Sequence, residues 1–453
     1  MKSTAAVSQR VQFANNIPGL NLLRFALLAF AISIASSSMA TAQAGQLDPS
    51  FATGGIFQAH FQLALDKAIA IQADGKIVVA GTLNSTQAVL IRLNTDGTLD
   101  PSFGSGGIVN ADFNDDGSTI VGLAIQPDGK ILAAADRALP PGFVVRYKSD
   151  GTPDTAFGKN GIANLPITHV NALALQPDGK ILGAGLAFMI DSNTSAVGRL
   201  DANGQVDKSF GSGGMTLLPG PQAVAIALQK DGKILTASPG FLDGQLYLPE
   251  SALASPQPSL LTRLKADGRI DASFGVGGQV ACLADSPAIA VQSDGKILAA
   301  GSVVARALPF PPGNNSGFGV LRYNSDGSID SSFGKHGGSV TSFTPALPEA
   351  AAFTLAVQTN GDIVVAGLAG QPVGNPNQPE GPSSFALARF TPRGQLDTTF
   401  GSGGKVFTTF GNNTAWISAL GIQTDGKVVA AGNNSSKPQQ ALNDFAVARY
   451  LAQ

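Results

Sequence analysis

The chain has 453 residues, of which 43% are hydrophobic and 13% are charged, a balance typical of a folded domain with a large core. The formal net charge is −2 and no run of Lys or Arg occurs, so nucleic acid is excluded as an expected partner. The single cysteine, Cys282, excludes an intrachain disulfide and a zinc site built on a cysteine cluster.

Residues 1–44 have the pattern of a secretory signal peptide. Positively charged residues precede an apolar stretch over residues 25–35, and small residues then lead to Ala42-Gln43-Ala44, an A-x-A cleavage site. The apolar stretch is too short to span a bilayer. We therefore expect an exported protein, periplasmic or extracellular, whose mature chain is a monomer that does not insert into a membrane.

Three sequence blocks recur seven times in the rest of the chain: L-D-x-S-F-G-x-G-G, Q-x-D-G-K-I-x-x-A-G and R-Y-x-x-D-G. The phenylalanines of successive copies lie 52 to 67 residues apart, and no long helical pattern intervenes. This period predicts a four-stranded propeller blade. We expect residues 45–453 to form one all-β domain, a seven-bladed β-propeller of antiparallel blades, with repeats starting near residues 48, 100, 154, 207, 271, 330 and 397.

The four strands of a blade follow from these blocks. Strand a is the apolar segment before the Gln, and strand b is K-I-L-A-A-G. Strand c contains the R-Y pair, and strand d is L-D-x-S-F-G-x-G-G-x-V. The two D-G pairs predict tight hairpin turns, a–b and c–d. Strands a and b are nearly continuous in apolar residues, as expected of strands that are covered on both faces.

The two ends of the repeat region predict how the ring closes. The region starts with a d strand at residues 47–59 and stops after a c strand at residues 446–451. The N-terminal strand is therefore expected to pair with residues 446–451 and to complete the seventh blade, which leaves no open pair of edges.

The three blocks resemble the delta-60 repeat, a β-propeller repeat of bacterial, often exported proteins. The resemblance covers about residues 47–453. It implies a propeller fold and no particular activity.

Residues that recur in every blade are assigned to the scaffold. We expect each R-Y arginine to pair with an acid or with turn carbonyls inside its own blade, and each recurrent Phe to lie in the core between blades. The alternative for the arginines is a ring around the axis that binds an anion.

The variable segments are the b–c loops. The longest lie in blades four to seven, on the face opposite the D-G turns, at residues 236–259, 302–318, 368–384 and 433–444. Binding residues concentrate in loops on a rigid scaffold, so a ligand is expected at this face. The alternative is neutral drift in tolerant surface loops.

Few side chains in the sequence point to chemistry. Candidate ligand-binding residues are His60, His169 and Trp416, all placed in or near d–a connections. The indole of Trp416 is the one that could stack on a sugar or peptide. His336 replaces a loop glycine and is expected to be exposed, whereas Cys282 is expected to be buried and inert.

One segment resembles the opening of a calcium loop. Asp112, Asn114 and Asp116 alternate before a glycine, but Leu123 stands where the loop's last ligand belongs. An ordinary polar turn is the preferred interpretation, so no cofactor is expected, with Ca²⁺ as the alternative.

Three functions fit these observations. The preferred one is a non-catalytic binding or interaction module for a protein, peptide or carbohydrate. The second is a hydrolase or lyase with its site at the axial mouth of the loop-bearing face, with His60, Asp112 and His169 as the residues that would converge there. The third is a structural component of the cell surface.

Overall fold

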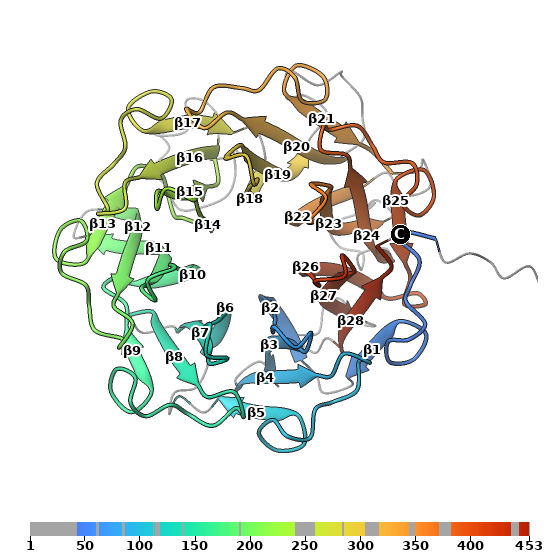
Figure 1. Cartoon of the computed structure of the whole chain (residues 1–453), viewed down its shortest axis with the longest axis horizontal. Helices are drawn as coiled ribbons and strands as arrows, with labels where there is room; N and C mark the ends of the chain where they lie inside the picture. Colours follow the sequence, from blue (N-terminus) through green and yellow to red (C-terminus); the bar gives the residue numbers. More distant parts are fainter. Residues whose placement is uncertain are drawn as a thin grey trace, which may run out of the picture. The chain divides into compact units, whose positions relative to one another are not determined.

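The computed structural model describes residues 43–452, except for 60–62, 84–86, 112, 114–117, 138–139, 190–191, 241–258, 283–284, 304–316, 344–348, 371–381 and 436–443. The residues from Ala42 to Gln453 form one compact unit. Within its described part, 28 strands form seven four-stranded antiparallel sheets, which stand around a common axis (Figure 1). The fold is the predicted all-β, seven-bladed propeller.

Each blade runs from an inner a strand to an outer d strand. The a strands are β2 (Leu63–Ile71), β6 (Thr119–Ile125), β10 (His169–Leu175), β14 (Ala225–Leu228), β18 (Asp285–Val291), β22 (Glu349–Val357) and β26 (Thr414–Ile422). The b strands are β3 (Ile77–Leu83), β7 (Ile131–Asp136), β11 (Ile181–Met189), β15 (Ile234–Ser238), β19 (Ile297–Val303), β23 (Ile363–Gly370) and β27 (Val428–Ser435).

The two outer positions complete each sheet. The c strands are β4 (Gln87–Leu93), β8 (Phe143–Tyr147), β12 (Ser192–Leu200), β16 (Ser259–Leu264), β20 (Gly317–Tyr323), β24 (Ser383–Phe390) and β28 (Asp444–Tyr450). The d strands are β5 (Ile108–Ala111), β9 (Ile162–Asn164), β13 (Met215–Leu218), β17 (Gln279–Cys282), β21 (Gly338–Thr341), β25 (Lys405–Thr408) and β1 (Ile56–Ala59).

Burial explains why the two middle strands are almost wholly apolar. Every described residue of β8 and all but the last of β7 are buried, whereas most residues of the inner strand β6 are half-buried. The b and c strands are covered by the neighbouring blades, and the a strands are the ones accessible from the axis.

The ring closes as the chain ends predict. β1 pairs antiparallel with β28, with Ile56 opposite Ala448 and Ala59 opposite Phe445. An isolated bridge joins Leu47 to Tyr450. The seventh blade therefore has the strand order β1-β28-β27-β26 and draws on both ends of the repeat region.

The predicted d strand was too long. In each blade the ladder begins only after the last glycine of the block, and L-D-x-S-F-G-x-G-G forms a compact turn before it. In blade 1, Gly104, Gly106 and Gly107 all have positive φ, a conformation that is incompatible with an extended strand. The turn is closed by the N–H of Gly107, which donates to the Phe103 carbonyl at 2.9 Å.

The R-Y arginines join neighbouring blades. Each guanidinium Nε donates to the L-D aspartate of its own blade at 2.7–2.9 Å. Each Nη1 donates to a carbonyl in the c–d turn of the next blade. The donor–acceptor pairs of this second bond are Arg92–Ser149, Arg146–Ala202, Arg199–Ala266, Arg263–Ser325, Arg322–Pro392, Arg389–Ala452 and Arg449–Thr95.

We call this arrangement the interblade latch. The predicted acid partner is correct, but the carbonyl partner lies in the adjacent blade and not within the same one. Because the seven guanidiniums are buried on the c strands, they do not form the anion-binding ring around the axis that was the alternative. Each guanidinium also lies 4.4–4.7 Å from the ring centroid of the recurrent Phe, which is fully buried as predicted.

The latch aspartates are held in the charged form. Burial raises the pKa of the Asp48 carboxyl, but hydrogen bonds from Ser50 and the charge of Arg449 outweigh it and lower the pKa to about 2. The pKa of Asp207 is lowered to about 2 by the corresponding partners, Ser209 and Arg199. Stability that depends on these ion pairs is present at neutral pH and is lost in acid.

Candidate functional site

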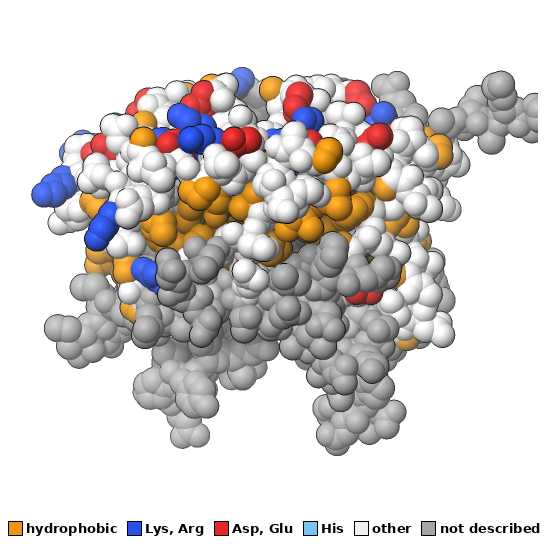
Figure 2. All heavy atoms as spheres, turned by 90° about the horizontal axis from the view of Figure 1, so that it is seen from below, with side chains coloured by type: hydrophobic (Ala, Val, Ile, Leu, Met, Phe, Trp, Pro, Cys, Tyr) orange, Lys and Arg blue, Asp and Glu red, His pale blue; other side chains and the backbone are white. Residues whose placement is uncertain are grey.

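The two faces of the ring differ in construction. The a–b and c–d turns lie on one face, where the D-G-K lysines reach the L-D aspartates, as Lys76 reaches Asp100 at 2.9 Å. Figure 2 shows the charged side chains gathered along this side, above a band of hydrophobic ones. We call it the D-G face. The b–c and d–a connections lie on the opposite face, which we call the loop face. Most of the four long b–c loops lies outside the described residues.

Inner strands carry an extra residue close to the loop face. Asn171 in β10, Phe353 in β22 and Ser418 in β26 have no partner position in the ladder. A β-bulge of this kind turns a side chain away from the regular alternation. The glycine that ends motif b lies opposite: a Cβ on Gly432 would stand 2.0 Å from the Trp416 carbonyl oxygen. The close approach of these two backbones explains the glycine at position 432.

His169 does not stand alone at the loop face. It is the first residue of β10 in blade 3, and its Nδ1 lies 3.1 Å from both carboxylate oxygens of Asp136, the last residue of β7 in blade 2. The same carboxylate accepts the Val170 N–H at 3.2 Å. The histidine thus ties two blades together, and its ring nitrogen and the carboxylate are both engaged in that contact.

Of the other predicted site residues, the structure describes only Trp416. His60, Asp112, Asn114 and Asp116 lie outside the described residues. Trp416 was placed in a d–a connection, but it lies in the a strand β26, half-buried and opposite Asn433. The described residues contain no group of three His, Cys, Asp or Glu side chains arranged to hold a metal ion.

Two single residues have the predicted environments. His336 is exposed and has φ +56°, which explains why glycine occupies this position in most other blades. Cys282 is fully buried on β17. The described part of the chain contains no helix that is long and apolar enough to cross a membrane.

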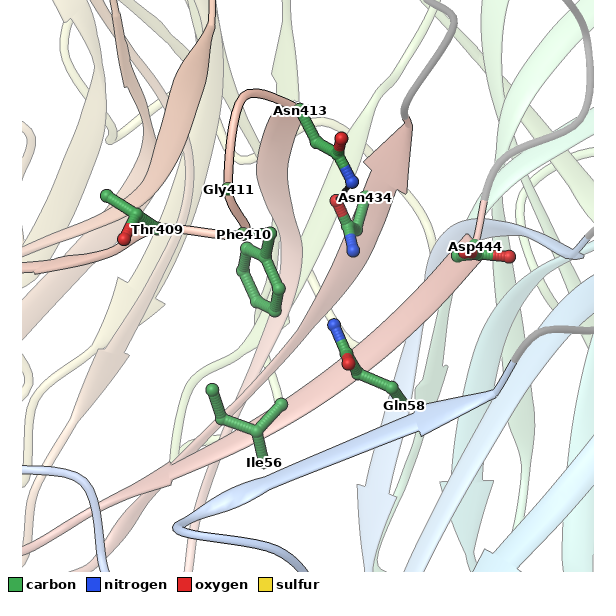
Figure 3. A pocket seen from close by; sticks show the side chains of 8 residues that line it. All are labelled: Ile56, Gln58, Thr409, Phe410, Gly411, Asn413, Asn434 and Asp444. Atoms are coloured by element: carbon green, nitrogen blue, oxygen red, sulfur yellow. Dashed lines mark hydrogen bonds between the residues drawn. The ribbon is translucent and has the colours of Figure 1, made fainter.

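A pocket of about 430 Å³ lies in blade 7 at the loop face. Its lining comes from three places that are distant in the sequence (Figure 3). The outer strand β1 supplies two residues, the β25–β26 connection supplies four, and the facing ends of β27 and β28 supply one each. These residues are Ile56, Gln58, Thr409, Phe410, Gly411, Asn413, Asn434 and Asp444.

The lining of this pocket is mostly uncharged and polar. Gln58, Asn413 and Asn434 bring side-chain amides, and Asp444 brings the one carboxylate among the described lining residues, whereas the Thr409 side chain points away from the amides (Figure 3). An amide offers both a donor and an acceptor, so this lining pairs with groups that do the same. Among the described residues of the lining there is no Lys or Arg, and the one charge is negative.

Two contacts hold the pocket in shape before any ligand binds. Asn413 Nδ2 donates to Asn434 Oδ1 at 2.8 Å, and Asn434 is only 4% exposed. Phe410 packs edge to face against Phe385, with ring centroids 4.9 Å apart. The amide pair and the apolar wall are therefore fixed by the fold, a property expected of a pre-formed binding site.

None of the pocket residues was singled out from the sequence, although Asn434 and Asp444 fall in the predicted loop 433–444 and the pairing of β1 with β28 was predicted. A signal was nevertheless present. Blade 7 alone follows its b-strand glycine with Asn433-Asn434, and its d–a connection contains a second pair, Asn412-Asn413. Comparison of the seven copies for polar departures on the loop face would have singled out this blade.

Comparison with known proteins supports the architecture. Segments 72–103, 126–157, 176–210, 292–333 and 358–400 match the model described as a domain of unknown function (DUF5122) beta-propeller. The chain is therefore similar to a β-propeller repeat family of unassigned function, and the delta-60 name stays a prediction. No curated protein matches the sequence.

Solved structures with similar backbones include enzymes. Virginiamycin B lyase from Staphylococcus aureus is 11% identical, with a TM-score of 0.47 over 87% of this chain and 99% of that chain. A gluconolactonase from Xanthomonas campestris is 15% identical, with a TM-score of 0.33 over 71% of this chain and 82% of that chain. These resemblances assign no activity to this chain.

Proposed function

We propose that the protein is an exported, non-catalytic binding module of the delta-60 type that holds a neutral, hydroxyl-rich ligand, a carbohydrate, in the blade 7 pocket. The observation that carries this proposal is the lining of the pocket. The amides of Gln58, Asn413 and Asn434 lie near Phe410 and Ile56 (Figure 3), and Asp444 is also part of the lining.

The chemistry of the lining favours a sugar over other ligands. Sugar hydroxyls both donate and accept hydrogen bonds, as the amides of Gln58, Asn413 and Asn434 do. The apolar side chains offer a surface for the C–H face of a sugar ring. An anionic ligand is disfavoured because Asp444 is the only charged residue among the described residues of the lining. The volume also falls within the usual range of small-molecule sites, about 300–1,000 Å³.

Binding accounts for this lining better than hydrolysis does. Glycoside hydrolysis in most families uses two carboxylates on either side of the scissile bond. Asp444 supplies the single carboxylate among the lining residues that the structure describes. His169, which would serve an axial active site, contacts Asp136 in a tie between blades.

The test is a binding screen of the purified exported protein against a panel of neutral oligosaccharides, followed by calorimetric titration of the strongest binder. Gln58→Ala removes an exposed amide from the pocket, and loss of one hydrogen bond should weaken binding about 5–10-fold. Asn110→Ala is the matched control, because Asn110 occupies the same d-strand position in blade 1 and is also exposed.

Two results would count against this proposal. If no neutral oligosaccharide binds, the ligand class is wrong. If both variants weaken binding equally, the ligand is held elsewhere on the ring.

A further inference from the structure

The c–d turn of each blade is hydrogen-bonded to the preceding blade. In blade 1 the turn carbonyl of Asp96 accepts from the N–H of Ala52, the residue after the recurrent Phe51 of blade 7, at 2.6 Å. Five further turns repeat this bond at 2.8–2.9 Å. Their donor–acceptor pairs are Gly104–Asp150, Gly158–Asn203, Gly211–Asp267, Gly275–Asp326 and Gly334–Arg393.

In blade 7 the corresponding turn is divided between the two ends of the propeller chain. The N–H of Gly401 in blade 6 donates to the carbonyl of Ala44 at 2.7 Å. The N–H of Gly45 donates to the Leu451 carbonyl at 2.9 Å, as Gly97 donates to Asn94 in blade 1. Ala44 and Gly45 therefore take the places of the Asp and Gly in a D-G turn whose first half comes from the C-terminal strand.

Position 45 requires glycine for the same reason as the other turn positions do. Its φ is +81°, and a Cβ there would stand 2.7 Å from the Gly401 nitrogen. In blade 1, a Cβ on Gly97 would stand 2.7 Å from the Ala52 nitrogen. The close approach of two backbones thus requires glycine at both positions.

The residues before Gly45 also belong to the folded ring. Ala44 is 5% exposed and is part of the hydrophobic cluster that contains Phe400 and Val406. Gln43 is exposed, but its Nε2 donates to the Gly401 carbonyl at 2.9 Å. Gly401 is therefore bonded through its N–H to Ala44 and through its carbonyl to Gln43.

From these contacts we propose that the leader is removed between Ala42 and Gln43, not after Ala44 as Ala42-Gln43-Ala44 alone predicts. Water adds across the Ala42–Gln43 peptide bond, which leaves a carboxylate on Ala42 and an amino group on Gln43. The sequence Ala40-Thr41-Ala42 supplies the small residues that such a peptidase needs before the cleaved bond.

Cleavage after Ala44 would damage the closing turn. It would take away the acceptor of the Gly401 N–H and the buried methyl group of Ala44. It would also place a charged amino group on Gly45, which is buried. An unsatisfied buried donor and a buried charge are both destabilising, so the seventh turn would be the weakest of the ring.

The inference rests on the export that forms part of the proposed function, and mass spectrometry of the exported protein tests it. The N-terminal peptide should begin at Gln43. A peptide that begins at Gly45 would overturn the inference and leave export intact. An exported chain that keeps residues 1–42 would also overturn the inference alone, whereas a chain that is not exported would overturn both.

Variants separate the two cleavage sites further. Ala40→Phe should block processing, because a bulky residue then replaces a small one that the proposed site needs, whereas Ala44→Phe should be processed normally even if it folds less well. The reverse pattern would contradict the proposed site.

Deletion of residues 43–44 from the precursor tests the structural reason. Processing after Ala42 then yields a chain that starts at Gly45, and its Tm should fall by roughly 2–4 °C. An unchanged Tm would show that Gln43 and Ala44 do not contribute to closure of the ring.

Discussion

Replacement of Arg449 by Met tests whether the interblade latch closes the ring. The Arg449 Nε donates to Asp48 Oδ2 at 2.9 Å, and Nη2 donates to Ser50 Oγ at 3.0 Å. Nη1 donates to the carbonyl of Thr95 in blade 1. Methionine fills much of the same space but provides none of these donors.

The cost follows from the burial of the pair. The side chains of Arg449 and Asp48 are only 5% and 4% exposed. Removal of one partner from a buried ion pair costs about 3–5 kcal/mol. Lys427 remains 3.3 Å from Asp48, so we expect the lower end, about 3 kcal/mol. With an unfolding entropy of about 2.1 cal/mol/K per residue over the propeller, this corresponds to a fall in Tm of roughly 3–4 °C.

Differential scanning calorimetry measures this change, and Arg269→Met is the control. Arg269 pairs with Asp267 at 2.7 Å, but the two side chains are 73% and 44% exposed. An exposed pair contributes about 0–1 kcal/mol, so the control should lower Tm by no more than roughly 1 °C. Equal shifts in the two variants would refute the argument that the buried latch stabilises the ring.

Two further predictions concern the charges of the D-G face. Because the pKa of Asp48 is depressed to about 2, below its unfolded value, its stabilising effect is complete above about pH 5 and is lost as the pH falls toward 2. The Tm should therefore fall when it is measured at decreasing pH between 7 and 3. Asp48→Asn should weaken that dependence of Tm on pH. Asp362 stands in blade 6 where the other blades have lysine, 3.9 Å from Arg389, which already pairs with Asp397. Asp362→Lys should therefore stabilise the protein by about 0.5–1 kcal/mol in a paired thermal scan, and a lower Tm would contradict this assignment.

Much of the fold could be predicted because the repeats determine it. The D-G turns, the apolar middle strands and the terminal d strand all follow from local sequence. The predicted d strand is longer than the observed one because Leu and Phe in L-D-x-S-F-G favour an extended conformation. Glycines with positive φ, such as Gly104, interrupt that conformation.

Contacts between blades could not be predicted in the same way. The Arg92 carbonyl partner, Ser149, lies 57 residues away in the next blade. A motif that is repeated in every blade cannot indicate whether a partner belongs to its own blade or to the next copy. The pocket was missed for another reason: the pairing of β1 with β28 was predicted, but Asn413 in the β25–β26 connection belongs to no repeated motif.

Hydrogen–deuterium exchange, with and without a saturating neutral oligosaccharide, tests the proposed binding site most directly. The account predicts that the ligand slows exchange in residues 56–59 and 409–413 and around Asn434 and Asp444, which line the blade 7 pocket. Residues 108–111, the equivalent outer strand of blade 1, should exchange at an unchanged rate. Protection confined to the D-G face, or to the inner strands around the axis, would contradict the proposed site.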